Sequence, residues 1–388
     1  MTAVLSLAVR LAGTVRNRRV TRYERRTRDS LAAFAAGASD EPPPPPQSAL
    51  ERRLIQRDLV ALRPKLKGQA AARIAELFVS YDLVDGARRD LRSRSVLLQV
   101  RAADALGTVG ATQAVPDLIE VLGAGDRASR LAAARALANL DAPEAVPAIF
   151  EALSDVGAHA EEVAEALVRF GALAVAPLRE RLRGSVSAGQ RRLAVVVLGD
   201  LRAFDAAADL RAVLSDPDPH VGCAAAHAVG RLGDVAAVPK LVEILRDGGD
   251  LELREAAADA LGAIDDPVAA PALVQALDAP EWALRDAAAR ALIALGDAGL
   301  DGLVDALDGV GDRGVAHFAG LLDVDDRLAP LIARAGLGDP GLQRFVRRLG
   351  ATGVHARLGE LASADEPLAT FARSVLVQGD DVTTAGGT

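Results

Sequence analysis

The sequence predicts an all-α fold, an α-solenoid of about ten stacked two-helix repeats. Three observations carry the prediction. A stretch of about thirty residues occurs twice in succession, at 220–250 and 252–281. Half of the residues are hydrophobic but only 3% are aromatic, so alanine supplies much of the core. Proline recurs at a fixed distance after the Ala-rich segments. Self-similarity at this period is typical of arrays whose units bury their apolar faces against neighbours.

Each repeat is expected to contain two short helices joined by a turn. Ala228 lies late in an Ala-rich helix and is followed by Gly230 and an Asp-containing turn, and small residues of this kind let helices approach closely. Eleven residues after Ala228, Pro239 is expected to start the second helix, because a proline in the first turn gives up an N–H that lacks an intrahelical partner anyway. The second copy repeats these positions as Ala260, Gly262 and Pro271.

The same spacing can be followed along most of the chain, with steps of 28 to 32 residues between anchor positions. The anchors are Ala75, Ala105, Ala136, Ala166, Val197, Ala228, Ala260, Ala291, Ala319 and Arg348. A proline stands eleven residues after six of them, at Pro116, Pro147, Pro177, Pro239, Pro271 and Pro330. The pattern is most regular over 97–312 and weakens towards the C-terminus, as expected of an end unit that shows one face to water.

The segments VRAADALGTVG…AVPDLIEVL (100–122) and ELREAAADALGAIDD…AAPALVQAL (252–277) resemble HEAT-like repeats of the phycobilisome-lyase type. The resemblance covers roughly residues 65–377. It implies an α-solenoid used mainly for protein binding or scaffolding, with the second helices on its concave face. The whole chain is also similar to bacterial membrane-anchored HEAT-repeat proteins, in which an apolar anchor, an Arg-rich helix and a loose linker precede the array.

Charge is distributed unevenly between the N-terminal segment and the rest of the chain. Residues 1–28 contain eight arginines and one glutamate, a net charge of +7, so the remaining 360 residues carry −15 of the total of −8. Three interpretations of 1–15 stay open: an amphipathic helix on a membrane surface, a truncated transmembrane helix, and a solvated helical lead-in. The expected membrane contacts are Arg16, Arg18, Arg19, Arg22, Arg25 and Arg26, which would place the body in the cytoplasm, peripheral to or anchored in the inner membrane.

The expected domain organisation has four parts. Residues 1–34 form a basic N-terminal helix, 35–48 a Pro-rich linker, 49–377 the repeat array and 378–388 a disordered tail. The five prolines at 42–46 favour a semi-rigid polyproline II spacer, and a Pro-rich docking ligand is the alternative.

Composition and motifs favour a non-enzymatic scaffold. An acidic body disfavours nucleic-acid binding, which needs clustered basic residues. None of the five histidines is followed by Glu, so the His-Glu pairs of HEAT-repeat deoxyhypusine hydroxylases are missing, and no cofactor or metal is expected. The single cysteine, Cys223, is expected to be a small buried core residue. A repeat-family enzyme or accessory, similar to a bilin lyase or a deoxyhypusine hydroxylase, is the alternative.

The candidate binding residues belong to the second helices and one inter-repeat turn. Trp282, the only tryptophan, is a candidate hot spot, although packing over the helix junction is the favoured interpretation of its position. Arg130, Arg191, Arg254 and Arg285 recur six residues before their anchors and are expected to stabilise turns or neighbouring layers. The expected partner-binding face is mainly acidic and suits a protein partner with a basic surface; its polar residues are Asp117, Glu120, Glu151, Lys240, Glu243 and Gln275.

Overall fold

The computed structural model describes residues 20–21, 23, 27–66, 68–153, 160–184, 187–324, 327–351 and 375. Within these ranges every regular element is a helix and no strand occurs, so the all-α prediction is confirmed. The chain divides into two compact units, Met1–Leu178 and Arg179–Thr388, where the sequence predicted a continuous array. The expected tail at 378–388 lies outside the described residues.

Unit 1 contains a helical segment at 27–35 and the helices up to the start of α10. Their bounds are α2 (Ala49–Leu62), α3 (Gln69–Ser80), α4 (Leu83–Leu91), α5 (Val96–Val109), α6 (Val115–Ala124), α7 (Arg127–Asn139), α8 (Val146–Leu153) and α9 (Ala160–Val168). Helix α10 (Val175–Arg183) crosses the division between the units.

Unit 2 continues the alternation of first and second helices. Their bounds are α11 (Ala188–Asp200), α12 (Ala207–Val213), α13 (Pro219–Leu232), α14 (Val238–Asp247), α15 (Leu251–Ile264), α16 (Ala270–Ala276), α17 (Trp282–Ala294), α18 (Asp297–Asp305), α19 (Asp312–Val324), α20 (Leu328–Gly336) and α21 (Pro340–Ala351). Over the described residues of both units, nine complete helix pairs run from α3/α4 to α19/α20, and α21 stands where a tenth would begin.

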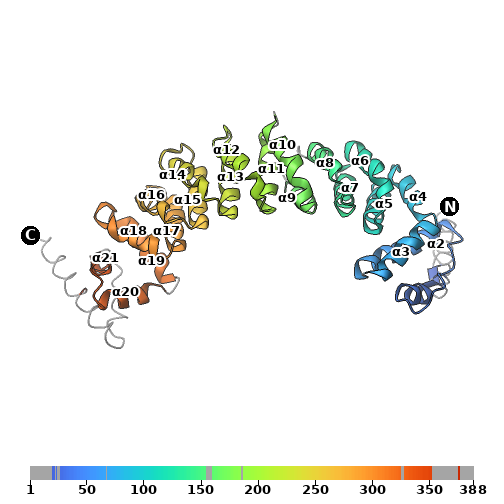
Figure 1. Ribbon diagram of the computed structural model, residues 1–388, viewed down its shortest axis with the longest axis horizontal. Helices are drawn as coiled ribbons and strands as arrows, with labels where there is room; N and C mark the ends of the chain where they lie inside the picture. Colours follow the sequence, from blue (N-terminus) through green and yellow to red (C-terminus); the bar gives the residue numbers. More distant parts are fainter. Residues whose placement is uncertain are drawn as a thin grey trace, which may run out of the picture. The chain divides into compact units, whose positions relative to one another are not determined.

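First helices stack on first helices within each unit, and second helices form a separate row. In unit 2, α11, α13, α15 and α17 contact one another in sequence, and α14 contacts α16 (Figure 1). In unit 1, α5 stacks on α7 and α6 on α8. Second helices also contact the first helix of the following pair, as α6 does with α7, α14 with α15 and α16 with α17. The α-solenoid prediction is therefore confirmed at the level of helix pairs and their order.

The anchor residues form the contact between consecutive first helices. All eight anchors from Ala105 to Ala319 are at most 3% exposed. A Cβ built at Gly262 would lie 2.8 Å from the Cα of Ala291, and one at Gly107 would lie 2.6 Å from the Cα of Ala136. Contacts this short leave no room for a side chain, so the glycine two residues after an anchor allows the next first helix to pack against it.

A short 3-10 turn precedes the second helix in the regular repeats. In unit 2 these turns are η6 (Phe204–Ala206), η7 (Val235–Ala237) and η8 (Pro267–Ala269). Pro239 and Pro271 then occupy the first turn of α14 and α16, as the sequence predicted. Aspartate or serine caps the next first helix by accepting a hydrogen bond from a backbone N–H of its first turn; the caps are Asp126, Ser187, Asp218 and Asp250.

The residue five positions after each anchor from Ala105 to Ala291 adopts a left-handed backbone conformation that closes the first helix. Glycine holds this position in several repeats, for example Gly233 with φ 63°. Elsewhere the position is held by non-glycine residues, including Arg202 with φ 48° and Asp265 with φ 61°. Asp-containing turns were predicted from the sequence, but their shared left-handed backbone conformation was not.

The recurring arginines stabilise the ends of second helices, as predicted. Arg130 donates to the carbonyl of Ala152 at 2.8 Å, and Arg285 donates to the carbonyl of Ala279 at 2.7 Å. Arg191 binds both carboxylate oxygens of Asp216 at 2.6 and 2.8 Å. Arg130 and Arg285 thereby satisfy carbonyls that a helix end or a turn leaves without an intrahelical donor, and Arg191 binds the carboxylate of a residue just after α12.

The Pro-rich segment contacts α3 and Tyr81, the residue that directly follows α3. Within 35–48, Pro43 is buried and its carbonyl accepts a hydrogen bond from Tyr81. Arg73 of α3 donates to the carbonyl of Ser39 at 3.2 Å and pairs with Asp40 at 2.8 Å. The segment is therefore held against α3 by side chains far away in the sequence.

We predict that Gly262→Ala destabilises the chain by about 1–3 kcal/mol, because the new methyl group would force α15 and α17 apart. Gly320→Ala in α19 is the matched control, since a Cβ there meets nothing within 4 Å. The control is expected to be neutral or to stabilise by up to about 1 kcal/mol through helix propensity. Urea unfolding measures both, and equal effects would contradict the close-approach interpretation.

A second prediction concerns acid sensitivity at Asp216. Burial would raise the pKa of this carboxyl, but hydrogen bonds from Arg191 and the Asp218 backbone lower it below its ordinary 3.8. A lowered folded pKa gives stability that is present above about pH 4 and lost as the pH falls through the folded value. Asp216→Asn should cost about 2 kcal/mol at pH 7 and flatten the loss of stability below pH 4. A variant that keeps the wild-type acid slope would disprove this role.

Candidate functional site

Some residues of the predicted second-helix face are exposed, and others make contacts within the fold. Glu120, Glu243 and Gln275 are exposed, and Lys240 is half-buried and pairs with Glu243 at 2.7 Å. Glu151 is exposed on α8. Whether this face is concave stays a prediction.

Asp117 departs from that prediction. Its side chain is 4% exposed, and its carboxylate accepts hydrogen bonds from Arg88 at 2.5 Å and Arg92 at 2.8 Å. The buried carboxylate thus joins α4 to α6. Asp117 is correspondingly a structural residue and not part of a free binding surface.

Trp282 stands at the surface, at the start of α17. It is 62% exposed, which corrects the expectation that it packs over the helix junction. Its ring makes an edge-on contact with the His317 ring of α19, with centroids 5.9 Å apart and planes at 85°. A large aromatic side chain that is held in place but left exposed is typical of interface hot spots.

A chain of polar contacts runs from Trp282 across three first helices. His317 Nε2 lies 3.2 Å from Asp286 Oδ1, and Arg290 Nε donates to Asp286 Oδ2 at 2.9 Å. Arg290 also reaches Asp259 of α15 at 3.3 Å. The contacts link α15, α17 and α19 and fix the polar side chains beside the tryptophan.

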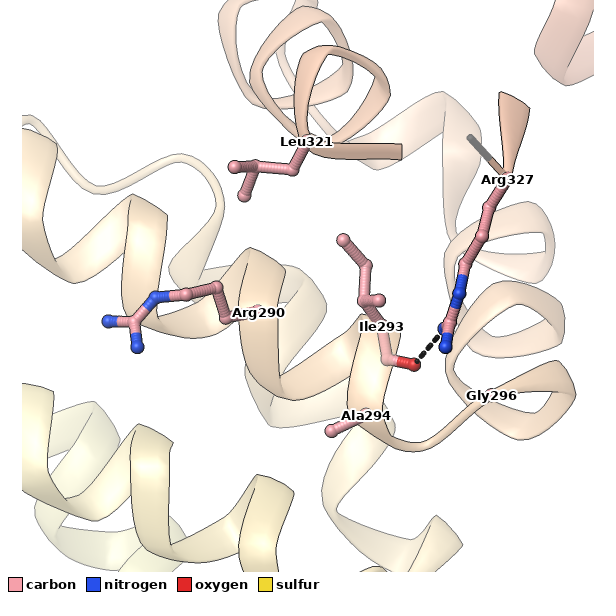
Figure 2. A pocket seen from close by; sticks show the side chains of 6 residues that line it. All are labelled: Arg290, Ile293, Ala294, Gly296, Leu321 and Arg327. Atoms are coloured by element: carbon pink, nitrogen blue, oxygen red, sulfur yellow. Dashed lines mark hydrogen bonds between the residues drawn. The ribbon is translucent and has the colours of Figure 1, made fainter. Parts of the chain in front are cut away.

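A groove of about 380 Å³ lies near the C-terminal end of α17, beyond this polar chain (Figure 2). Ile293 and Leu321 give it apolar walls, and Arg290 and Arg327 lie on opposite sides of Ile293. Arg327 donates to the Ile293 carbonyl at 3.1 Å, which fixes its guanidinium at the rim. At 1.5 Å per residue, Trp282 and Ile293 are separated by about 16 Å along α17. We call the surface from Trp282 to this groove the α17–α19 face.

The neighbouring helix α15 is acidic on its exposed side. Burial raises the pKa of Glu255, and the negative charges of Glu252 and Asp259 raise it further. Burial likewise raises the pKa of the half-buried Cys223 thiol to about 11, with Asp250 and Glu252 adding to the shift. Cys223 is therefore less buried than predicted, and a thiol with so high a pKa is a poor nucleophile at neutral pH. Burial is the larger cause of both pKa shifts, and the nearby carboxylates add to each.

No group of three or more His, Cys, Asp or Glu side chains within the described ranges could hold a metal ion. His220 and His227 are exposed on α13, and His317 is engaged with Trp282 and Asp286.

The predicted membrane contacts lie outside the described residues: Arg16, Arg18, Arg19, Arg22, Arg25 and Arg26. Among the helices that can be described, none is long and apolar enough to cross a bilayer.

The α17–α19 face was not predicted from the sequence, because the residues that form it belong to different repeats. Asp259 and Arg290 are 31 residues apart, as are Asp286 and His317, so one repeat period separates the partners of each pair. The available signal was an aspartate followed one period later by an arginine or a histidine, which occurs twice in adjoining helices. The groove has no such signal, because it depends on how α17, α19 and α20 meet.

Comparison with known proteins gives a family match and several structural likenesses. The family model for HEAT repeats matches residues 83–169, 175–262 and 238–319. No curated protein matches. The crystal structure of Kap121p is similar over 89% of this chain with a TM-score of 0.54 and 14% identity, and that of Kap121p bound to RanGTP over 85% with a TM-score of 0.57 and 13% identity. The chain spans only about 41% and 40% of those two chains.

A weaker likeness links the chain to the CpcE–CpcF complex of phycocyanin lyase from Nostoc. Sequence identity is 28%, the match covers 74% of this chain and 97% of that one, and the TM-score is 0.25. A TM-score this low supports no conclusion about this chain.

Proposed function

Because the chain belongs to the HEAT-repeat family, we propose that it is a non-enzymatic scaffold that binds a protein partner. The observation that carries the proposal is Trp282, an exposed aromatic side chain braced by His317. Kap121p, whose repeats share this fold, has been solved with RanGTP and with Ste12p, which supports protein binding as the use of such a surface.

The partner is proposed to have a basic surface. On α15, next to the α17–α19 face, Glu252 is exposed and Glu255 and Asp259 are half-buried carboxylates. On the second-helix face, Glu120 and Glu243 are exposed carboxylates of the same sign. Complementary charge would steer a basic partner towards both faces, while the aromatic and apolar groups near Trp282 would hold it.

We predict that Trp282→Ala weakens partner binding by about 2 kcal/mol, roughly thirtyfold in Kd, because truncating an aromatic hot spot typically costs that much. Partners captured by the immobilised full chain would be purified and their Kd measured by calorimetry. Leu337→Ala is the matched control, since Leu337 directly follows α20 and is 80% exposed. The exposure of Trp282 implies an unchanged melting temperature for the variant. Equal Kd values for wild type and Trp282→Ala would contradict the proposed site.

A further part of the proposal is that the Arg-rich segment of residues 1–28 tethers the scaffold to the cytoplasmic face of a membrane. Its net charge of +7 against a body of −15 supports this, because arginines near an anionic surface contribute about 1 kcal/mol each.

Replacing Arg16, Arg18, Arg19, Arg22, Arg25 and Arg26 with glutamine should abolish co-sedimentation of the full chain with vesicles containing phosphatidylserine. Because surface attraction between charges is screened by salt, the wild-type chain should also be released as ionic strength rises. Unchanged sedimentation of the variant would rule out the tether.

A further inference from the structure

The groove beside Ile293 lies where the close contact between first helices is interrupted. Gly199, Gly230 and Gly262 stand two residues after their anchors, and a Cβ built on any of them would lie within 3.1 Å of the Cα of the next anchor. The equivalent position of α17 holds Ile293, two residues after Ala291. An isoleucine side chain cannot fit into so short a distance, so it holds α19 further away, and the groove opens at this end of α17.

The walls of the groove are apolar. Leu321 holds the position in α19 that Ile293 holds in α17, two residues after the anchor Ala319. In Figure 2 the Ile293 side chain points towards the helix that carries Leu321. Both side chains are half-buried, so each shows part of its surface to solvent. A volume of about 380 Å³ is at the lower end of the range for ligand sites, so the groove suits a short segment of a ligand and not a large cofactor.

The two arginines of the groove differ in how their charge is balanced. Arg290 pairs with Asp286 at 2.9 Å and with Asp259 at 3.3 Å, and its guanidinium points away from Ile293 (Figure 2). Within the described ranges, Arg327 pairs with no carboxylate and donates to the Ile293 carbonyl at 3.1 Å. Arg327 therefore supplies the positive charge of the groove, whereas Arg290 supplies its aliphatic stem.

Arg327 is not explained by the helix end that it touches or by the repeat. The Ile293 carbonyl already accepts a backbone hydrogen bond from Gly296 at 3.1 Å, so it has a donor without the arginine. Arg327 also stands three residues before Pro330, and the other repeats with this proline have no cation there. Their residues at this position are Gln113, Glu144, Ala174, Ala236 and Val268. The arginine is therefore specific to the layer that has the groove.

A carboxylate beside an apolar group is the chemistry that this arrangement favours. A guanidinium presents paired N–H donors that match the two oxygens of a carboxylate. The C-terminal residue of a polypeptide carries a carboxylate and a side chain on one Cα, so a single residue can contact both the Arg327 guanidinium and the apolar surface of Ile293. A partner with a basic surface has few acidic side chains to offer, but its chain still ends in this carboxylate unless the end is modified.

We propose that the groove binds the C-terminal residue of a partner protein, with the α-carboxylate on Arg327 and an apolar side chain between Ile293 and Leu321. The proposal rests on the proposed protein-binding function, and it names the part of the partner that this end of the α17–α19 face takes. Trp282 lies about 16 Å away along α17, whereas three extended residues span at most about 10 Å. A tripeptide in the groove therefore tests this site without Trp282, and either proposal can fail alone.

The test titrates the full chain with the capped tripeptide acetyl-Ala-Ala-Leu and with the same peptide ended by an amide, followed by ligand-observed NMR. We expect the free acid to bind at least tenfold more tightly than the amide, because the amide cannot form the charge-assisted hydrogen bonds. Arg327→Gln should bind both peptides equally, with the affinity that the wild type has for the amide.

Arg313→Gln is the matched control, because it removes an exposed arginine from the N-terminal end of α19, away from the groove. It should keep the preference for the acid, as should Trp282→Ala. Ala294→Trp fills the groove from an exposed position and should abolish binding of both peptides. All of these variants should keep the wild-type melting temperature, since each changes an exposed side chain.

Four outcomes would overturn the proposal. They are no binding of the free acid, equal affinity of the wild type for acid and amide, a preference for the acid that persists in Arg327→Gln or Ala294→Trp, and binding of acetyl-Ala-Glu-Leu-amide as tight as that of the free acid. The last result would make an internal acidic segment the occupant.

Discussion

The first helices from α11 to α17 approach so closely that each repeat offers a glycine where the next offers an alanine. This contact sets the distance between layers in unit 2, and the buried alanines on either side of it follow from that distance. Leucines then fill the space between first and second helices, where more room is available. The pairs that make the contact are Gly199 with Ala228, Gly230 with Ala260, and Gly262 with Ala291.

Because the repeats bury their apolar helix faces against one another, the residues at the helix ends and in the turns can differ from one repeat to the next. Functional residues are expected there. Trp282 begins a first helix and is not needed to bury a helix face. An exposed apolar group at such a position carries a solubility cost, which protein binding would offset. We propose that the partner bound near Trp282 has a basic surface.

Much of the fold could be predicted from the sequence, because anchor, glycine and proline recur at fixed spacing and each has a local physical meaning. Pro239, for example, starts α14 as expected. Side chains whose partners lie in another layer could not be placed in this way. From the sequence, Asp117 is predicted to be a surface carboxylate. In the fold it accepts a hydrogen bond from Arg88, which lies 29 residues earlier in the chain. The exposure of Trp282 depends on how α19 meets α17, and the left-handed backbone of Arg202 has no residue signature.

No helix pair is expected to be stable without its neighbours. Circular dichroism of the isolated pair at residues 219–247, compared with the full chain in the same buffer, tests this most directly. The account predicts a largely unfolded peptide with no cooperative melting, because the close contacts of Gly230 and Ala228 lie with other repeats. A helical pair that melts cooperatively on its own would contradict it.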